Sequence, residues 1–383
     1  MIEIKDKKDC CGCNACVQIC PKKCISMEED QEGFFYPHTD ASLCISCGLC
    51  EKVCPVINQH ENREPLKVYA VKNLDEVTRL NSSSGGVFSV LSEYILSKGG
   101  VVFGAMWKND EWYVEHGYIE SINDLHLLQG SKYLQSRIGN SYSTTEFFLK
   151  QGRFVLFSGT PCQISGLYGF LRKKYDNLLT CEIFCHSVPS PKVWKWYLKE
   201  QLYQLHWNSN NIKDIKFRSK VNGWKSYSLA IINKDGQIFT QTAASNPFIK
   251  GFVNNLYSRP SCHFCPAKHL KSGSDFSLGD YWKIDRYHPD IDDDKGISAV
   301  LVNSEKAYSI LKDLSNQELI ETNFNEICLC NPALIFSSKK SNKRKKFYNS
   351  RVVSFSKLVN DLCSESLILR IKIFIYNLLR AKK

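Results

Sequence analysis

The chain has 383 residues, of which 43% are hydrophobic and 23% charged, so it can bury a real core and is not expected to be disordered. Its 50 basic residues exceed its 39 acidic ones, a formal net charge of +11, but basic residues are not interleaved with aromatics as a nucleic-acid partner would require. Much of the basic excess lies in one run near the end of the chain: Lys339, Lys340, Lys343, Arg344, Lys345 and Lys346.

Eighteen cysteines are far more than a chain of this length ordinarily carries. In a secreted protein they would indicate disulfides, but residues 1–6 are charged and no apolar stretch follows, so no signal peptide is expected. No segment reaches the ~18 uninterrupted apolar residues of a membrane span. We therefore expect a cytoplasmic protein whose cysteines are reduced and bind metal.

Residues 1–60 hold ten of the cysteines, arranged as two copies of one unit. Each copy has the spacing Cys-x2-Cys-x2-Cys-x3-Cys-Pro, the arrangement of bacterial two-cluster ferredoxins. In that arrangement three thiolates wrap one cubane and the fourth ligates the other cluster. The spacing predicts two 4Fe-4S clusters, one held by Cys10, Cys13, Cys16 and Cys54 and the other by Cys44, Cys47, Cys50 and Cys20.

A pair of zinc sites is the alternative, because zinc also binds Cys-x2-Cys. Zinc has no use for the repeated x3-Cys-Pro ending, so the spacing favours iron. Cys11 and Cys24 fall outside the frame and are predicted to be small buried side chains.

After a linker at residues 61–65, strand-like and helix-like stretches alternate. Strands are predicted at residues 68–71, 101–105, 154–157 and 178–184, and at 227–232 and 237–242 on either side of a Lys-Asp-Gly turn. Helices are predicted at residues 87–96, from 161 to about 171, and from a start at 189–192. The pattern favours an α/β domain with a mixed sheet between about residues 66 and 335.

The predicted fold is therefore an α+β ferredoxin-like N-terminal domain followed by a larger α/β domain with a mixed sheet. The predicted boundaries are residues 1–62 for the first domain, 63–338 for the second and 339–383 for a basic C-terminal tail. Within the tail, residues 367–379 are largely apolar, with Arg370 and Lys372 inside the stretch, which indicates a packed terminal helix. Peripheral contact with an anionic membrane surface is the alternative.

Four more cysteines lie beside turn-forming or polar residues: Cys162, Cys185, Cys262 and Cys265. They suffice for one more cubane or one zinc, and their spacing is equally compatible with scattered buried cysteines. Cys181 lies inside an apolar run and is predicted to be a core residue. Cys328, Cys330 and Cys363 have no evident partners.

Six segments together resemble the beta-subunit family of coenzyme F420-reducing hydrogenases and dehydrogenases, over almost the whole chain up to about residue 335. They are residues 83–86 (Ser-Ser-Gly-Gly), 130–133 (Gly-Ser-Lys-Tyr), 159–163 (Gly-Thr-Pro-Cys-Gln), 185–190 (Cys-His-Ser-Val-Pro-Ser), 259–265 (Arg-Pro-Ser-Cys-His-Phe-Cys) and 275–280 (Asp-Phe-Ser-Leu-Gly-Asp). Each alone is weak, but in this order behind a two-cluster ferredoxin they are specific.

The resemblance implies FAD in the α/β domain and a third 4Fe-4S cluster close to it, with ligands at Cys162, Cys185, Cys262 and Cys265. It also implies the following flavin contacts: Ser84, Gly85, Gly86, Ser131, Lys132 and Tyr133. A Gly-Gly pair before a helix suits the approach of a phosphate or ring, although residues 82–86 also fit an ordinary helix N-cap. Lys132 and Tyr133 also fit an exposed, solvated pair. The segment lacks the Gly-x-Gly-x-x-Gly fingerprint, so no Rossmann NAD site is predicted.

Together these features predict an iron–sulfur flavin-dependent oxidoreductase. Electrons from a redox partner protein or reduced ferredoxin would pass through the clusters to FAD, and then to a deazaflavin (F420-like) or another organic substrate. The alternative is a non-catalytic relay subunit that feeds a separate enzyme. No catalytic residue is predicted; His186 is a candidate proton donor or, more simply, a structural histidine.

Overall fold

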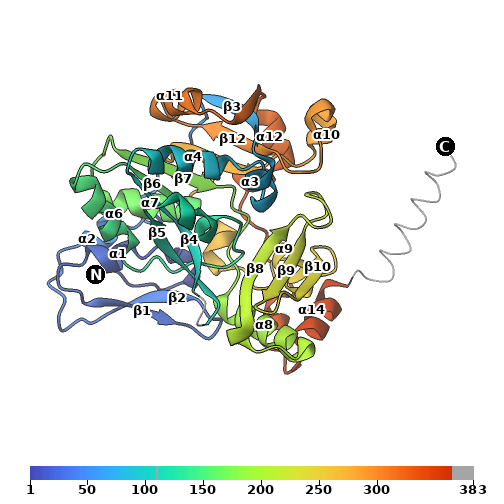
Figure 1. Ribbon diagram of the computed structural model, residues 1–383. Coiled ribbons are helices and arrows are strands. Elements are labelled where there is room, and N and C mark those ends of the chain that lie inside the picture. Colours follow the sequence, from blue (N-terminus) through green and yellow to red (C-terminus); the bar gives the residue numbers. More distant parts are fainter. Residues whose placement is uncertain (109–110, 365–383) are drawn as a thin grey trace.

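The computed structural model describes residues 1–108 and 111–364 (Figure 1). The N-terminal domain contains α1 (Ala15–Ile19), β1 (Ile25–Glu29), β2 (Phe35–Thr39) and α2 (Leu49–Lys52). β1 and β2 form an antiparallel hairpin, with Ile25 opposite Thr39. Ala15 and Val53 of this small domain are buried in the same apolar cluster as residues of the large domain, so the two domains share a core.

The large domain is built on an eight-stranded mixed sheet with the strand order β13-β3-β12-β11-β7-β6-β4-β5. The strands are β3 (Lys67–Asn73), β4 (Val101–Lys108), β5 (Tyr113–Ile119), β6 (Val155–Gly159), β7 (Leu178–Ile183), β11 (Phe276–Asp280), β12 (Ser298–Val302) and β13 (Gln317–Glu321). The four central strands β4, β6, β7 and β11 are parallel, and the outer ones pair antiparallel.

The central strands are apolar because both faces of the sheet are covered. Residues 101–103 of β4 and 155–157 of β6 are fully buried. On one face they pack against α6 and α7 and the N-terminal domain, and on the other against α4 and α11.

The helices described beyond the N-terminal domain are α3 (Glu76–Asn81), α4 (Val87–Ser97), α5 (Leu125–Leu128), α6 (Ser141–Lys150), α7 (Pro161–Leu171), α8 (Pro191–Leu205), α9 (Pro247–Val253), α10 (Ile284–Tyr287), α11 (Glu305–Asp313), α12 (Phe324–Cys330), α13 (Arg344–Tyr348) and α14 (Phe355–Cys363).

Local sequence explains where the helices that carry site residues begin. Thr160 caps α7 in a capping box with Gln163, and Pro161 takes the first helical position, where its missing N–H costs nothing. Ser190 caps α8 in the same way, accepting a hydrogen bond from the Val193 amide. Gly86 precedes α4 with φ of +87°, a left-handed conformation that favours glycine.

A second, three-stranded sheet contains β8 (Ile212–Ser219), β9 (Ser228–Asn233) and β10 (Ile238–Thr242). It packs with α8, α9 and α14 around an aromatic core, seen beside the main sheet in Figure 1. The predicted hairpin at residues 227–242 is confirmed, since Ile232 pairs with Ile238. It belongs to this separate sheet and not to the main one.

The other predicted elements are confirmed to within a few residues, and the longest difference is β4, which continues to Lys108. The described part of the predicted C-terminal tail is not separate from the large domain. α13 and α14 bury Phe347, Phe355 and Leu358 in the core of the second sheet. The apolar stretch at residues 367–379 lies outside the described residues. Among the residues described, the helices are all too short or too polar to cross a membrane.

Candidate electron-transfer and cofactor sites

The two cysteine motifs of the N-terminal domain contribute to two pockets. The first is lined by Cys10, Cys13, Cys16 and Cys54, with Cys11 beside them. The second is lined by Cys20, Cys44, Cys47 and Cys50, with Cys24 beside them. The fourth cysteine of each motif thus lies with the first three of the other, as the spacing predicts. We call these the inner set and the outer set, because the first faces the large domain and the second faces solvent.

Each cysteine loop bends through two residues in the left-handed region. In the inner loop these are Gly12 (φ +71°) and Asn14 (φ +65°), and in the outer loop Ser46 (φ +55°) and Gly48 (φ +71°). Such a bend turns backbone amides toward the sulfurs; the Ser46 amide lies 3.4 Å from Cys44 Sγ. Amides that point at sulfur are the hydrogen bonds on which cubane clusters depend.

The large domain packs closely on the inner set. Gly166 of α7 lies so near that a Cβ there would be 2.8 Å from the Cβ of Cys13. One turn along, a Cβ at Gly169 would be 2.4 Å from the carbonyl oxygen of Val53. Only glycine permits these approaches. The packing leaves Cys13, Cys16 and Cys54 buried, whereas Cys47 of the outer set is exposed.

Cys162, Cys185, Cys262 and Cys265 form a third set. Cys162 is in the first turn of α7, Cys185 follows β7, and the other two lie in or beside the 3₁₀ turn Pro260–Phe264. Burial raises the pKa of Cys185, and the neighbouring Cys262, Cys162 and Cys265 add to that rise, so these three lie within electrostatic range of Cys185. Among residues 1–108 and 111–364, no three such side chains converge as the ligands of one metal ion do.

Burial makes these thiols hard to ionise without a cation. It raises the pKa of Cys16, in the inner set, to about 12. It raises the pKa of Cys262, in the third set, to about 12 as well. Cysteine binds iron as the thiolate. Buried cysteines can therefore ionise only if a bound group supplies compensating positive charge, as the iron of a cluster does.

Cys11 lies between the inner and the third sets. Its neighbour Cys13 raises the pKa of the Cys11 thiol, and Cys11 in turn raises the pKa of Cys162, so Cys11 lies near both sets. The predicted burial of Cys11 and Cys24 is confirmed, as is the core position of Cys181. Spacing alone could not reveal that Cys11 links two cysteine sets, because Cys162 is far away in sequence.

The segments assigned to flavin by resemblance lie together. The amide and hydroxyl of Ser131 donate to Ser83 Oγ at 2.7 and 2.9 Å, which joins the loop at residues 130–133 to the loop before α4. Arg218 joins them as well, donating to Tyr133 Oη at 3.3 Å and to the Ser83 carbonyl at 3.2 Å. Sequence reasoning missed Arg218, which lies on β8 of the second sheet.

Several of the assigned side chains are already used within the protein. Ser84 Oγ donates to the Ile297 carbonyl at 2.7 Å. A Cβ at Gly85 would lie 2.2 Å from the Val71 carbonyl oxygen, so this glycine is required for packing on β3. Lys132 Nζ donates to the carbonyls of Leu127 and Gln129, and burial lowers the pKa of its ammonium to about 7.

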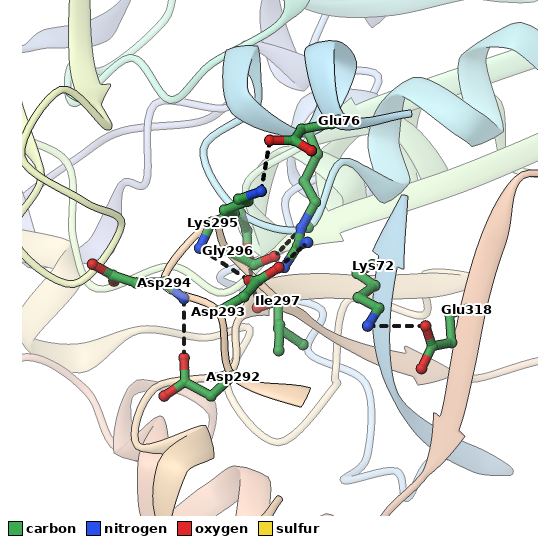
Figure 2. A network of polar contacts seen from close by, with 12 residues as sticks. Lys72, Glu76, Asp292, Asp293, Asp294, Lys295, Gly296, Ile297 and Glu318 are labelled. Atoms are coloured by element: carbon green, nitrogen blue, oxygen red, sulfur yellow. Dashed lines mark hydrogen bonds and ion pairs between the residues drawn. The ribbon is translucent and has the colours of Figure 1, made fainter. Parts of the chain in front are cut away.

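The loop at residues 292–297 supports the Ser83–Gly86 region from behind. Arg79 pairs with both carboxylate oxygens of Asp293 and donates to the Gly296 carbonyl. Figure 2 shows the same loop tied to α3 by Lys295 and Glu76, which are 2.6 Å apart. A Cβ at Gly296 would come within 2.6 Å of the Ser84 carbonyl oxygen. The loop before α4 is therefore held rigidly.

Two buried donors near this loop have no hydrogen-bond partner in the described chain, Asn73 Nδ2 and Arg218 Nε. Asn73 adjoins Gly86, since a Cβ on that glycine would be 3.1 Å from the Asn73 Cβ. Unpaired buried donors are costly, and an anionic group such as a phosphate would satisfy them. In this respect the residues present fit a phosphate-bearing cofactor.

His186 follows Cys185 but is held by structure. Its Nε2 lies 2.9 Å from Asn255 Oδ1, and its ring meets Phe252 edge-on. Burial lowers the pKa of its imidazole, so the neutral form is favoured. These contacts favour the structural interpretation of His186.

Comparison with known proteins finds a cluster-binding domain followed by a larger domain, the order predicted along the chain. Residues 152–326 match the family model that describes the C terminus of the coenzyme F420 hydrogenase/dehydrogenase beta subunit, and residues 9–58 match the 4Fe-4S dicluster domain. The F subunit of the F(420)H(2) dehydrogenase of Methanosarcina mazei is 24% identical over 285 residues, which cover 70% of this chain and 75% of that protein.

A ferredoxin 7Fe of Hydrogenibacillus schlegelii is 44% identical over 64 residues, 16% of this chain and 76% of that protein. Among solved structures, a chain of the F420-reducing NiFe hydrogenase complex from Methanosarcina barkeri aligns with a TM-score of 0.48 and 15% identity. That alignment covers 71% of this chain and 90% of the other.

Proposed function

We propose that this chain is an iron–sulfur flavoprotein oxidoreductase of the coenzyme F420 hydrogenase/dehydrogenase beta-subunit type, because residues 152–326 match the model of that family's C terminus and residues 9–58 match the 4Fe-4S dicluster domain. It passes electrons between 4Fe-4S clusters and FAD, and from there to or from a deazaflavin of the F420 type or another organic substrate. It works beside a partner protein, as the relative named as a subunit of a dehydrogenase suggests.

The observation that carries the proposal is the order of the cysteine sets in space. Cys50 of the outer set is near enough to Cys16 of the inner set to affect its ionisation. Cys11 affects the ionisation of Cys13 in the inner set and of Cys162 in the third set, so it lies near both. The next residue on α7, Gln163, donates to Ser136 Oγ at 2.9 Å. Ser136 is on the segment that continues from the proposed flavin loop at residues 131–133, so the sets form one path from solvent to that loop.

The chain's own residues supply thiolates, charge and exclusion of water along this path. The ligands would be the inner, outer and third sets defined above. Lys268 is buried beside the third set and donates to the Cys185 carbonyl at 2.7 Å, so it would place a positive charge next to a cluster held by these thiolates.

FAD, when bound, supplies the exchange between one-electron steps and two-electron hydride chemistry. The rigid loop before α4, Asn73 and Arg218 would hold its phosphate-bearing part, and Tyr133 lies against Arg218 at the same place. Lys132 adds a positive charge only below about pH 7, so we expect its contribution to anion binding to fade as the pH rises past that value.

Metal and flavin analysis of protein purified without oxygen tests the proposal. About twelve irons, with matching sulfide and one FAD, would support it. About eight irons and no flavin would instead favour a relay subunit with no substrate of its own. Zinc in place of iron would overturn both. A screen of small-molecule donors with a dye acceptor separates the two redox roles, because a relay is active only with its partner enzyme.

A further inference from the structure

Arg259 is a buried cation without a carboxylate partner. Its side chain is fully buried, at 0% exposure. It donates to the carbonyl of Cys10 at 2.8 Å, the carbonyl of Phe35 at 2.9 Å and Gln135 Oε1 at 2.9 Å. Its fourth contact is the sulfur of Cys10, 3.5 Å away. All its hydrogen-bond partners in the described chain are thus neutral oxygens and one cluster-forming sulfur.

Within residues 1–108 and 111–364, the two other buried arginines show what such a residue ordinarily requires. Arg218 makes a two-pronged pair with Asp280, and Arg79 makes one with Asp293. An isolated buried charge costs several kcal/mol, so an arginine without a carboxylate needs another anion. At Arg259 the nearest candidate anion is the set of thiolates on which it lies.

The inner loop is shaped to let this arginine approach. A Cβ at Gly12 would lie 2.9 Å from Arg259 Nη1 and 2.5 Å from Gln135 Nε2. The guanidinium also lies 4.3 Å from the centre of the Tyr36 ring. Arg259 precedes the turn that carries Cys262, so one residue of the third-set segment is fixed on the inner set.

We propose that the Arg259 guanidinium is the fixed counter-charge of the inner cluster and raises its reduction potential above that of the outer cluster. The inference rests on the proposed iron–sulfur function of the inner set. A 4Fe-4S cluster with four thiolates is an anion, and one added electron makes it more negative by one charge with no proton required. A buried cation at this distance stabilises the reduced form more than the oxidised form.

In the described chain the outer set has no buried cation beside it. Met1 and Lys22 line its pocket, but both are exposed, so water and salt screen their charges, and the Met1 ammonium also pairs with Glu51. Arg259 therefore makes the step from the outer to the inner cluster favourable. This arrangement draws electrons from the protein surface toward the large domain.

The test is an EPR-monitored redox titration of the full-length protein with its clusters. With Arg259→Gln, the ratio of reduced to oxidised inner cluster at a fixed potential should fall at least tenfold, about 59 mV for one electron. The reduction potential of the outer cluster should not change. Arg259→Lys should restore most of the shift, because it keeps the charge. Arg137→Gln is the matched control, since Arg137 is exposed and stacks on Phe35 of the same hairpin.

A second variant guards against loss of the cluster in Arg259→Gln. Gln135→Glu puts a carboxylate at the atom 2.9 Å from Arg259 Nη1 and neutralises the cation without removing it. It should also lower the inner potential. An unchanged inner potential in iron-replete Gln135→Glu, or equal shifts of both clusters, would overturn the inference. It would leave the proposed function intact, whereas wild-type protein without iron would remove that function.

Discussion

The inner and outer cysteine loops have the same spacing and the same backbone bend but different surroundings. The first left-handed position is Gly12 in the inner loop and Ser46 in the outer loop. A Cβ at the inner position would collide with Gln135 and Arg259, whereas the outer loop carries a real Cβ there. The motif determines which sulfurs gather, and the surroundings determine what each gathered set can do.

The same contrast extends to exposure. The inner set lies under α7 and beneath a buried arginine, while the outer set lies among exposed apolar side chains such as Leu43 and Ile45. A cluster with an exposed edge and apolar neighbours suits electron exchange with another protein. A buried cluster beside a compensating charge suits electron transfer into the large domain. Four experiments test whether the inner and outer sets differ in this way.

The largest expected effect is the loss of a whole cluster from one region. Cys54 belongs to the second motif in sequence but lines the inner pocket, and Cys20 belongs to the first but lines the outer one. Cys54→Ala should remove the inner cluster and Cys20→Ala the outer one, each with loss of about four irons. Iron analysis and EPR measure this. We expect the inner cluster to have the higher reduction potential. If Cys20→Ala removed the EPR signal of that cluster instead, the fourth cysteine of each motif would not ligate the cluster of the other motif.

The next effect is in how fast the cysteine thiols of the two sets are alkylated once the clusters have been oxidised. After limited ferricyanide oxidation at pH 8, we expect the thiols Cys47 and Cys20 to be alkylated at least about tenfold faster than Cys16. Cys47 is exposed, whereas burial raises the pKa of Cys16 to about 12 and keeps it protonated. Burial opposes ionisation of Cys20 too, but hydrogen bonds from the Cys24 backbone and side chain help lower its pKa.

The pH dependence of the labelling has a defined sign. Raising the pH toward 12 increases the thiolate fraction of Cys16 and should narrow the difference, and lowering it should widen the difference. Peptide mass spectrometry reads out each position. Equal alkylation rates of Cys16 and Cys47 at pH 8 would mean that burial does not protect the inner set from the reagent.

A smaller effect should follow from exchanging the first left-handed residues. Gly12→Ser makes the inner loop like the outer one and forces Gln135 and Arg259 away, at a cost of about 1–3 kcal/mol in unfolding free energy. It should also lower the inner reduction potential. Ser46→Gly should change stability by less than about 1 kcal/mol and leave both potentials unchanged. Denaturant unfolding and redox titration check the pair, and equal effects at both positions would refute the contrast.

The features that were predicted from sequence are those with local causes. Cysteine spacing determined the inner and outer sets, because ligands a few residues apart must share a loop. Thr160 and Ser190 marked their helices, because capping involves neighbouring residues.

The features that were missed depend on residues far apart in the chain. Arg259 meets Cys10 across 249 residues, and nothing in its own neighbourhood in the sequence indicates that contact. The basic run near residue 344 was assigned to a C-terminal tail outside the large domain, yet Arg344 pairs with Glu32 and Phe347, three residues on, is buried. The alternating pattern of residues 227–242 predicted a hairpin but could not identify β8 as its partner.

The smallest expected effect concerns the ring beneath the inner arginine. Tyr36 lies 4.3 Å from the guanidinium, and Tyr36→Leu should cost about 0.5–2 kcal/mol of unfolding free energy through the lost cation–π contact. Because the charge of Arg259 remains, the inner potential should move less than in Arg259→Gln. Tyr36→Phe is the matched control, since the Tyr36 hydroxyl is buried with no partner in the described chain. Removing an unsatisfied group should be neutral or stabilising, so a Tyr36→Phe cost equal to that of Tyr36→Leu would show that the hydroxyl, and not the ring, supports the arginine.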